Sequence, residues 1–172
     1  RTTNILGVLA GLDPSFTYYG RSGALEIYTS AVTQVMARTY HSGNYAKTIC
    51  GLSDVNSNLA TFGRDMMIMN VMQSSSFRTF VTLYNIGETC TVNIDIIQNG
   101  TVIGSFTKSL VLWDYQKFNV FAEAGLTGTY TNCWVRVTVQ DTGGPQGWIF
   151  CSGATANNIT NDPAYRVAQG WF

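Results

Sequence analysis

The chain carries few residues whose types and spacing could do chemistry. Its single histidine, His41, lies near Ser42, Ser53 and Asp54, the residue types of a Ser-His-Asp triad. No G-x-S-x-G turn surrounds either serine, so His41 is interpreted as a loop histidine. The ten carboxylates are scattered, and nothing in the sequence singles out two of them as a glycosidase pair. We expect no catalytic site, and a hydrolase whose carboxylates or His41 converge in a cleft is kept only as a third hypothesis.

Metal-binding patterns are incomplete. Asp54-x-Asn56-x-Asn58 resembles the start of a calcium loop, but the glycine is missing and residue 65 is Asp where the loop needs Glu. Four methionines lie between Met66 and Met72, yet soft copper sites usually need His or Cys nearby, and neither occurs there. This segment is interpreted as a buried strand or an adaptable subunit contact, with Met67 and Met69 as candidate contacts. We expect no metal and no cofactor.

The four cysteines favour disulfides in an oxidising compartment. An even number of cysteines in a low-charge β protein, with no C-x-x-C pair, is more typical of disulfides than of zinc. Of the three pairings, Cys133–Cys151 with Cys50–Cys90 is preferred, because residues 133–139 and 147–151 are expected to form a hairpin. Buried free thiols are the alternative.

Two sequons and four tryptophans are candidates for contact with sugars. The sequons are Asn99-Gly-Thr101 and Asn158-Ile-Thr160, and the first coincides with a turn, where Asn is favoured for its backbone. Exposed aromatic side chains can stack on carbohydrate, but core or interface packing is the preferred interpretation. The tryptophans are Trp113, Trp134, Trp148 and Trp171.

The elements that must position these residues are β-strands. Apolar residues alternate with polar ones from Cys90 to Ile96 and from Cys133 to Val139, the period of a half-buried strand. Asn99-Gly100 between apolar strands predicts a two-residue hairpin. Only Val120 to Ala124 has a helical pattern, for one or two turns. The chain is therefore predicted to be all-β, with strands about every 10 residues, as in a Greek-key sandwich.

A repeated pattern suggests two modules. Asn4-Ile5-Leu6 runs into Ala10-Gly11-Leu12, and Asn119-Val120-Phe121 runs into Ala124-Gly125-Leu126, each followed by a predicted hairpin. Strands from Phe77 to Trp113 precede the second copy, whereas none precede the first. We expect a partial domain with an N-terminal segment over residues 1–73 and a complete sandwich over residues 74–172.

A set of turn and strand motifs resembles a known family. In order, they are Phe77-Arg78-Thr79, Val81-Thr82-Leu83-Tyr84-Asn85, Asn99-Gly100-Thr101-Val102-Ile103-Gly104, Ala124-Gly125-Leu126 and Asn157-Asn158-Ile159-Thr160-Asn161-Asp162-Pro163. They resemble the Ig-like β-sandwich repeats of large secreted bacterial proteins, and residues 21–43 resemble the late hairpin of a preceding repeat. The resemblance covers about three quarters of the chain. It implies tandem Ig-like sandwiches, the first incomplete, and indicates fold more than function.

The arrangement is also similar to extracellular fibril subunits in which a strand from one subunit completes the sandwich of the next. Such head-to-tail contacts do not close and therefore propagate into a filament. The favoured donor is the apolar N-terminal segment 1–12, and the other is the C-terminal segment 164–172. Their candidate contact residues are Ile5, Leu6, Val8 and Leu9 in the first and Trp171 and Phe172 in the second. The alternative function is a carbohydrate-binding or adhesive module of a larger secreted protein.

Composition agrees with assembly. The 172 residues are 45% hydrophobic and only 12% charged, and the formal net charge is zero. Nucleic-acid binding needs clustered Lys and Arg, so that class is excluded, whereas a neutral surface favours association. No apolar run reaches the length of a membrane-spanning helix. We expect a secreted homopolymer that does not insert into membranes and could carry glycans.

Overall fold

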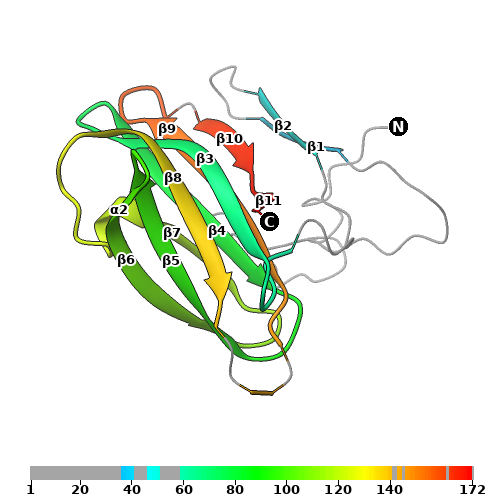
Figure 1. The fold of residues 1–172 in the computed structure, drawn as a ribbon. Coiled ribbons are helices and arrows are strands. Elements are labelled where there is room, and N and C mark those ends of the chain that lie inside the picture. Colours follow the sequence, from blue (N-terminus) through cyan, green and yellow to red (C-terminus); the bar gives the residue numbers. More distant parts are fainter. Residues whose placement is uncertain are drawn as a thin grey trace.

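A computed structural model describes residues 36–40, 46–50, 59–140, 143–144, 146–161 and 163–171 (Figure 1). The described chain is mostly β-strand, as the sequence predicts. Residues 59–171 form two antiparallel sheets that pack face to face as a sandwich. Two further strands, β1 (Met36–Tyr40) and β2 (Ala46–Cys50), pair antiparallel in a separate two-stranded sheet.

The larger sheet has five strands in the order β11-β3-β8-β5-β6. Their bounds are β3 (Asp65–Gln73), β5 (Cys90–Gln98), β6 (Thr101–Leu110), β8 (Tyr130–Val139) and β11 (Gln169–Trp171). The turn between β5 and β6 is the predicted two-residue hairpin, since Asn99 and Gly100 have φ values of 51° and 79°. In β3 a bulge shifts the register between Ile68 and Val71, where Asn70 has a φ of 55°.

The smaller sheet has four strands in the order β10-β9-β4-β7. Their bounds are β4 (Phe77–Asn85), β7 (Tyr115–Asn119), β9 (Ile149–Asn157) and β10 (Pro163–Val167). The predicted helical turn is α2 (Val120–Glu123), which follows β7 directly. Asn119 caps it, because its Oδ1 accepts hydrogen bonds from the backbone N–H groups of Phe121 and Ala122.

The core lies between the two sheets and follows the predicted alternation. On β5, Cys90, Val92, Ile94 and Ile96 are all buried. Cys133, Val135, Val137 and Val139 on β8 are buried as well, while Trp134 faces outward. The sheets come close at Gly153 of β9, where an added Cβ would lie 2.6 Å from Cγ2 of Ile68. A side chain at position 153 would therefore push the sheets apart.

The two long sides of the sandwich are closed differently. On one side α2 lies beside β6, with Lys108 and Glu123 in a 2.7 Å ion pair and the rings of Phe106 and Phe118 edge to face. On the other side the C-terminal segment passes from one sheet to the other at the buried Ala168. It pairs with β9 as β10 and with β3 as β11.

Two expectations about connectivity are wrong. Strands β8 and β9 do not form a hairpin, because β8 pairs with β3 and β5 in one sheet while β9 pairs with β4 and β10 in the other. The connection between them crosses from sheet to sheet. In addition, β3 pairs with β8, so the boundary expected at residue 73 falls within the sandwich. Local patterning cannot reveal which strands pair here, because β8 pairs with β3 and β9 pairs with β4, and the two strands of each pair are far apart in the sequence.

Candidate interaction surface

Three connections and one preceding segment meet at one end of the sandwich, which we call the loop end. The connections are residues 86–89 after β4, residues 111–114 after β6 and the described part of the β8–β9 connection. Residues 59–64 join them, since Ala60 and Ile149 exchange backbone hydrogen bonds of 2.9 and 3.0 Å. The loop end is thus built from segments that are distant in sequence.

Asn85 holds the loop end together. Its side chain is fully buried, and its Nδ2 donates hydrogen bonds to the backbone carbonyls of Glu88, Leu110 and Val111. Its Oδ1 accepts from the backbone N–H groups of Gly87 and Trp148. These five bonds connect all three loops. The two amide hydrogens are shared among three carbonyls, and both lone pairs of the oxygen are used, so the loop backbones are held in one arrangement.

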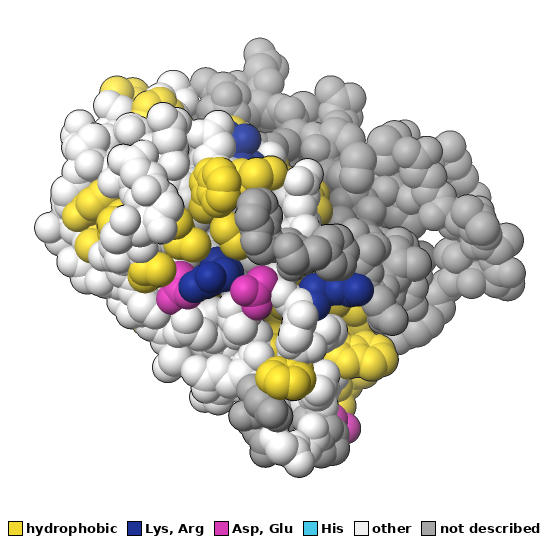
Figure 2. Space-filling view, viewed as in Figure 1, with side chains coloured by type: hydrophobic (Ala, Val, Ile, Leu, Met, Phe, Trp, Pro, Cys, Tyr) yellow, Lys and Arg dark blue, Asp and Glu magenta, His cyan; other side chains and the backbone are white. Residues whose placement is uncertain are grey.

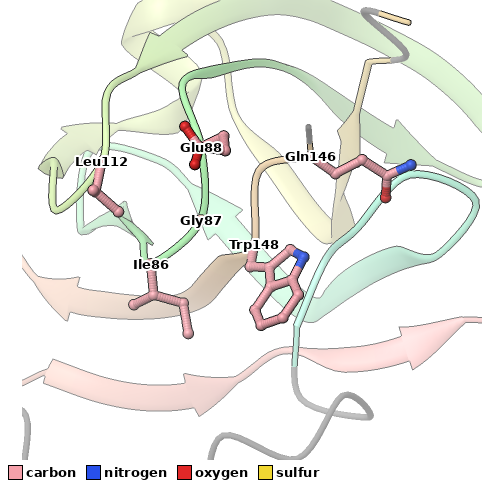
Figure 3. A pocket seen from close by; sticks show the side chains of 6 residues that line it. All are labelled: Ile86, Gly87, Glu88, Leu112, Gln146 and Trp148. Atoms are coloured by element: carbon pink, nitrogen blue, oxygen red, sulfur yellow. The ribbon is translucent and has the colours of Figure 1, made fainter. Parts of the chain in front are cut away.

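A shallow hollow of about 330 Å³, which we call the loop-end hollow, lies among these loops. Its lining residues are Ile86, Gly87, Glu88, Leu112, Gln146 and Trp148 (Figure 3). The indole of Trp148 is 46% exposed and also borders a second hollow of about 340 Å³, lined by Thr61, Phe62, Gly63, Arg64 and Gln146 as well. The side chain of Trp148, whose backbone N–H is bonded to Asn85, therefore stands between two concave surfaces.

Further apolar side chains are exposed around the hollow. Val111, Leu112 and Trp113 on the β6–β7 connection are all more than 40% exposed, and so is Phe62. Trp113 has a φ of 65°, which a bulky residue adopts only when the surrounding structure imposes it. Its backbone N–H donates to the carbonyl of Asn85 at 2.8 Å, which ties this conformation to the same residue. Exposed apolar residues grouped at one place are typical of interaction surfaces.

The opposite end, which we call the turn end, carries the β3–β4 turn and the β9–β10 turn. Arg78 donates 2.7 Å hydrogen bonds to Oδ1 of Asn158 and to Oδ1 of Asn161. Asn158 in turn donates to the carbonyls of Ser74 and Ser75. The amide nitrogen that a glycan would need at this sequon is thus already bonded, whereas Asn99 of the other sequon lies exposed in its turn.

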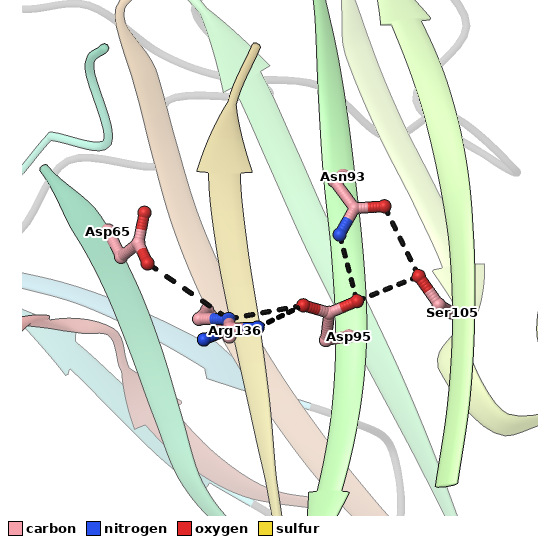
Figure 4. Close-up of polar contacts among 5 residues, drawn as sticks. All are labelled: Asp65, Asn93, Asp95, Ser105 and Arg136. Atoms are coloured by element: carbon pink, nitrogen blue, oxygen red, sulfur yellow. Dashed lines mark hydrogen bonds and ion pairs between the residues drawn. The ribbon is translucent and has the colours of Figure 1, made fainter. Parts of the chain in front are cut away.

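A polar ladder crosses the outer face of the five-stranded sheet (Figure 4). Asp95 accepts hydrogen bonds from Nε and Nη2 of Arg136, at 3.1 and 2.5 Å, and also from Ser105 and Asn93. Burial alone would raise the pKa of Asp95, but these bonds and the positive charge of Arg136 outweigh it, so the pKa lies below its usual range. Asp65 lies 4.0 Å from Arg136 on the other side. Every member of the ladder is partnered, which indicates a structural role.

Space-filling representation shows how sparse charge is on this surface (Figure 2). A short run of acidic and basic side chains crosses the middle of the view, and hydrophobic side chains form separate patches among uncharged ones. Such a surface offers little charge repulsion between copies of the chain. Among the described residues, no group of three or more His, Cys, Asp or Glu could hold a metal ion.

The expected disulfides are not formed by the described cysteines. Cys90, Cys133 and Cys151 are buried free thiols, and the preferred pair Cys133–Cys151 rested on a hairpin that does not exist. Burial raises the pKa of all three thiols, that of Cys151 to about 12, so all three are protonated near neutral pH. The side chain of Cys50 lies outside the described residues.

The candidate inter-subunit contact residues differ in exposure and in whether the structure describes them. Met67 is buried, although it pairs with Arg136 on the outward-facing phase of β3, whereas Met69 is exposed. Trp171 ends β11, which pairs with β3 of the same chain. Phe172 and the N-terminal candidates Ile5, Leu6, Val8 and Leu9 lie outside the described residues.

Comparison with protein-family models, with curated proteins and with solved structures found no match for this chain. In the part of the chain that the structure describes, no helix has the length and apolar character needed to span a bilayer. The geometry of the two ends is therefore the basis for a functional interpretation. Asn85 is the residue organising the loop end that the sequence did not identify, although its position on the buried phase of β4, after Val81 and Leu83, was a usable signal.

Proposed function

We propose that the protein is a structural subunit of an extracellular filament, assembled head to tail by strand complementation between copies. The observation that carries this proposal is the position of the C-terminal segment. It supplies an edge strand to each sheet, β10 beside β9 and β11 beside β3, and so completes both. A terminal segment that pairs only at sheet edges can make the same pairings with a second copy, which is a low-cost route to assembly.

Two further features support assembly. The chain has zero net charge and few charged residues, so copies repel one another weakly. In addition, Arg166 on β10 has a buried Nε for which the described part of the chain offers no hydrogen-bond partner. Arg166 as a whole is only half-buried, but an enclosed N–H without an acceptor is costly, and exchange of β10 between copies would change what surrounds it. The tandem Ig-like relationship stays part of this proposal and is supported by the sequence resemblance.

A paired-cysteine experiment tests the proposal. Gln169 and Met67 are direct partners across β11 and β3, so the double variant Gln169→Cys, Met67→Cys can be oxidised in the assembled state. Strand complementation predicts filaments by negative-stain electron microscopy and a ladder of covalent oligomers on a denaturing gel. Filaments that release only internally linked monomers would place the contact elsewhere. Filaments lost when the chain starts at Thr17 would assign donation to the N-terminal segment, and dispersed monomers throughout would refute the filament.

A carbohydrate-binding or adhesive module is the second candidate, favoured by Trp148. Its exposed indole is flanked by the side chains of Glu88 and Gln146, which could bond to sugar hydroxyls while the ring stacks on the sugar face. This function predicts a stable monomer that binds glycans on an array. It also predicts that Trp148→Ala abolishes binding while the outward-facing Trp134→Ala does not.

A further inference from the structure

Ile159 is the most exposed large hydrophobic residue among those described, at 84%. It lies at the tip of the β9–β10 turn, at the turn end of the sandwich. An isoleucine on a flexible loop would need no explanation, because single exposed apolar residues are common. This turn, however, is fixed from several directions, and that makes Ile159 a preformed projection.

Three asparagines and one arginine hold the β9–β10 turn in place. Asn157 Oδ1 accepts hydrogen bonds from the backbone N–H groups of Ile159 and Thr160, at 2.8 and 3.1 Å. The backbone N–H of Asn161 donates to the carbonyl of Asn157, and Arg78 bonds to both Asn158 and Asn161. A projection held this firmly loses little conformational entropy when it is buried in a contact.

The loop-end hollow is the complementary shape. Ile86, Leu112 and Trp148 supply its apolar walls, and Asn85 fixes the backbones that carry them. The hollow and the projection lie at opposite ends of β4: Phe77 pairs with Asn157 beside the turn, while Asn85 pairs with Ile149 beside the hollow. Nine residues of strand separate them by about 26 Å, so one molecule cannot bring the two together.

Charge is complementary as well. Glu88 borders the hollow, and Arg78 lies beneath the projection. Among the described residues, neither side chain takes part in the ion pairs that join Lys108 to Glu123 and Arg136 to Asp65 and Asp95. The carboxylate at the loop-end hollow and the guanidinium at the turn favour head-to-tail over head-to-head contact, with Arg64 of the loop end lying at the second hollow.

We propose that Ile159 of one copy inserts into the loop-end hollow of the next, with Arg78 approaching Glu88 of that neighbour. This inference rests on the proposed filament and deepens it by naming the longitudinal contact. It requires that β10 stays paired within its own chain, because the bonds that fix the β9–β10 turn include Asn161. A projection at one end and a hollow at the other form a heterologous contact that does not close on itself. Each subunit therefore offers one free projection and one free hollow, and the chain of subunits grows along the direction of β4.

The test uses the full 172-residue chain and measures the concentration above which it sediments as filaments. Ile159→Asp should raise this critical concentration roughly tenfold or more, because an apolar contact is lost and a charge is placed beside Glu88. Val102→Asp is the matched control, an exposed apolar residue at the start of β6 on the other sheet, and should leave it unchanged. Circular dichroism verifies that both variants are folded.

Cysteine crosslinking then tests the pairing itself. The double variant Ile159→Cys, Leu112→Cys should give a ladder of covalent oligomers on oxidation, while each single variant gives dimers at most. Filaments that withstand Ile159→Asp and give no ladder would overturn this contact and leave the filament intact. Loss of assembly in Ile159→Asp without a ladder in the double variant would also overturn it. No filaments from the unmodified chain would refute the proposed function and this contact together.

Discussion

The loop end and the turn end are both held by asparagine side chains, but at different depths. At the loop end one fully buried amide, that of Asn85, bonds to three loops from within. At the turn end Asn157, Asn158 and Asn161 lie near the surface, and Arg78 donates hydrogen bonds to the last two. Buried Asn85 holds three loops around a hollow, whereas the asparagines near the surface support a turn that projects. The same side-chain chemistry thus produces a hollow at one end and a projection at the other.

The largest effect should come from removing the hub at the loop end. Asn85→Ala removes the side-chain partner of two backbone N–H groups and three carbonyls, most of them partly buried, and among the described residues only the carbonyl of Val111 keeps a bond from a loop N–H, that of Asp114. We expect a loss of about 4 kcal/mol in the free energy of unfolding, since each unsatisfied buried group costs about 1–3 kcal/mol and some will find water. Urea unfolding monitored by tryptophan fluorescence measures it.

Asn119→Ala provides the comparison for this variant. It removes two hydrogen bonds from a one-turn helix that solvent can reach, and a lost helix cap costs about 1 kcal/mol. Equal effects of the two substitutions would show that Asn85 is an ordinary polar residue and that the loop end is held by something else.

Removing Arg78, the residue at the centre of the turn-end network, should lower the free energy of unfolding less than removing Asn85 does. Arg78→Ala removes two charge-assisted hydrogen bonds and the packing of the guanidinium over the ring of Phe80. We expect about 2 kcal/mol of destabilisation, because the freed asparagine groups can turn to solvent. Arg78→Lys keeps the charge but not the two-pronged geometry and should recover less than half of the loss. Full recovery by lysine would mean that charge alone holds the turn.

Sequence patterning predicted the local parts of this structure and not the distant ones. The alternation on β5 and β8, the Asn99–Gly100 hairpin and the turn of helix at Val120 depend on neighbours in sequence, and all are confirmed. The crossing from β8 to β9 depends on strand partners up to 80 positions apart, Phe77 and Asn157, and Asn85 bonds to a residue 63 positions away. Nothing local encodes such a partner, so the loop-end hollow could not be predicted.

Lowering the pH should weaken the Asp95–Arg136 ion pair on the sheet face between the two ends. The pKa of Asp95 is lower in the folded chain than its ordinary value near 4, so its ion pair with Arg136 stabilises the fold above that pH. This stability is lost as the pH falls through the lowered folded pKa. Asp95→Asn should cost about 1–2 kcal/mol at pH 7, because the pair is partly open to water at Arg136, and should flatten the dependence of stability on pH below about 4. An unchanged acid profile in this variant would assign the dependence to other carboxylates.

Thiol labelling distinguishes the two ends without perturbing assembly. Cys90 begins β5 at the loop end, while Cys133 lies near the start of β8 at the turn end, and burial raises the pKa of both. Both thiols should resist alkylation at pH 7 in the native protein, with labelling only through local opening. In Asn85→Ala, labelling of Cys90 should accelerate about tenfold or more relative to Cys133, because each 1.4 kcal/mol of lost local stability is a factor of ten. Peptide mass spectrometry after timed alkylation measures the two rates in one sample. Equal acceleration at both cysteines would mean that the sandwich opens as one unit, and the two ends would then not be independent elements of the fold.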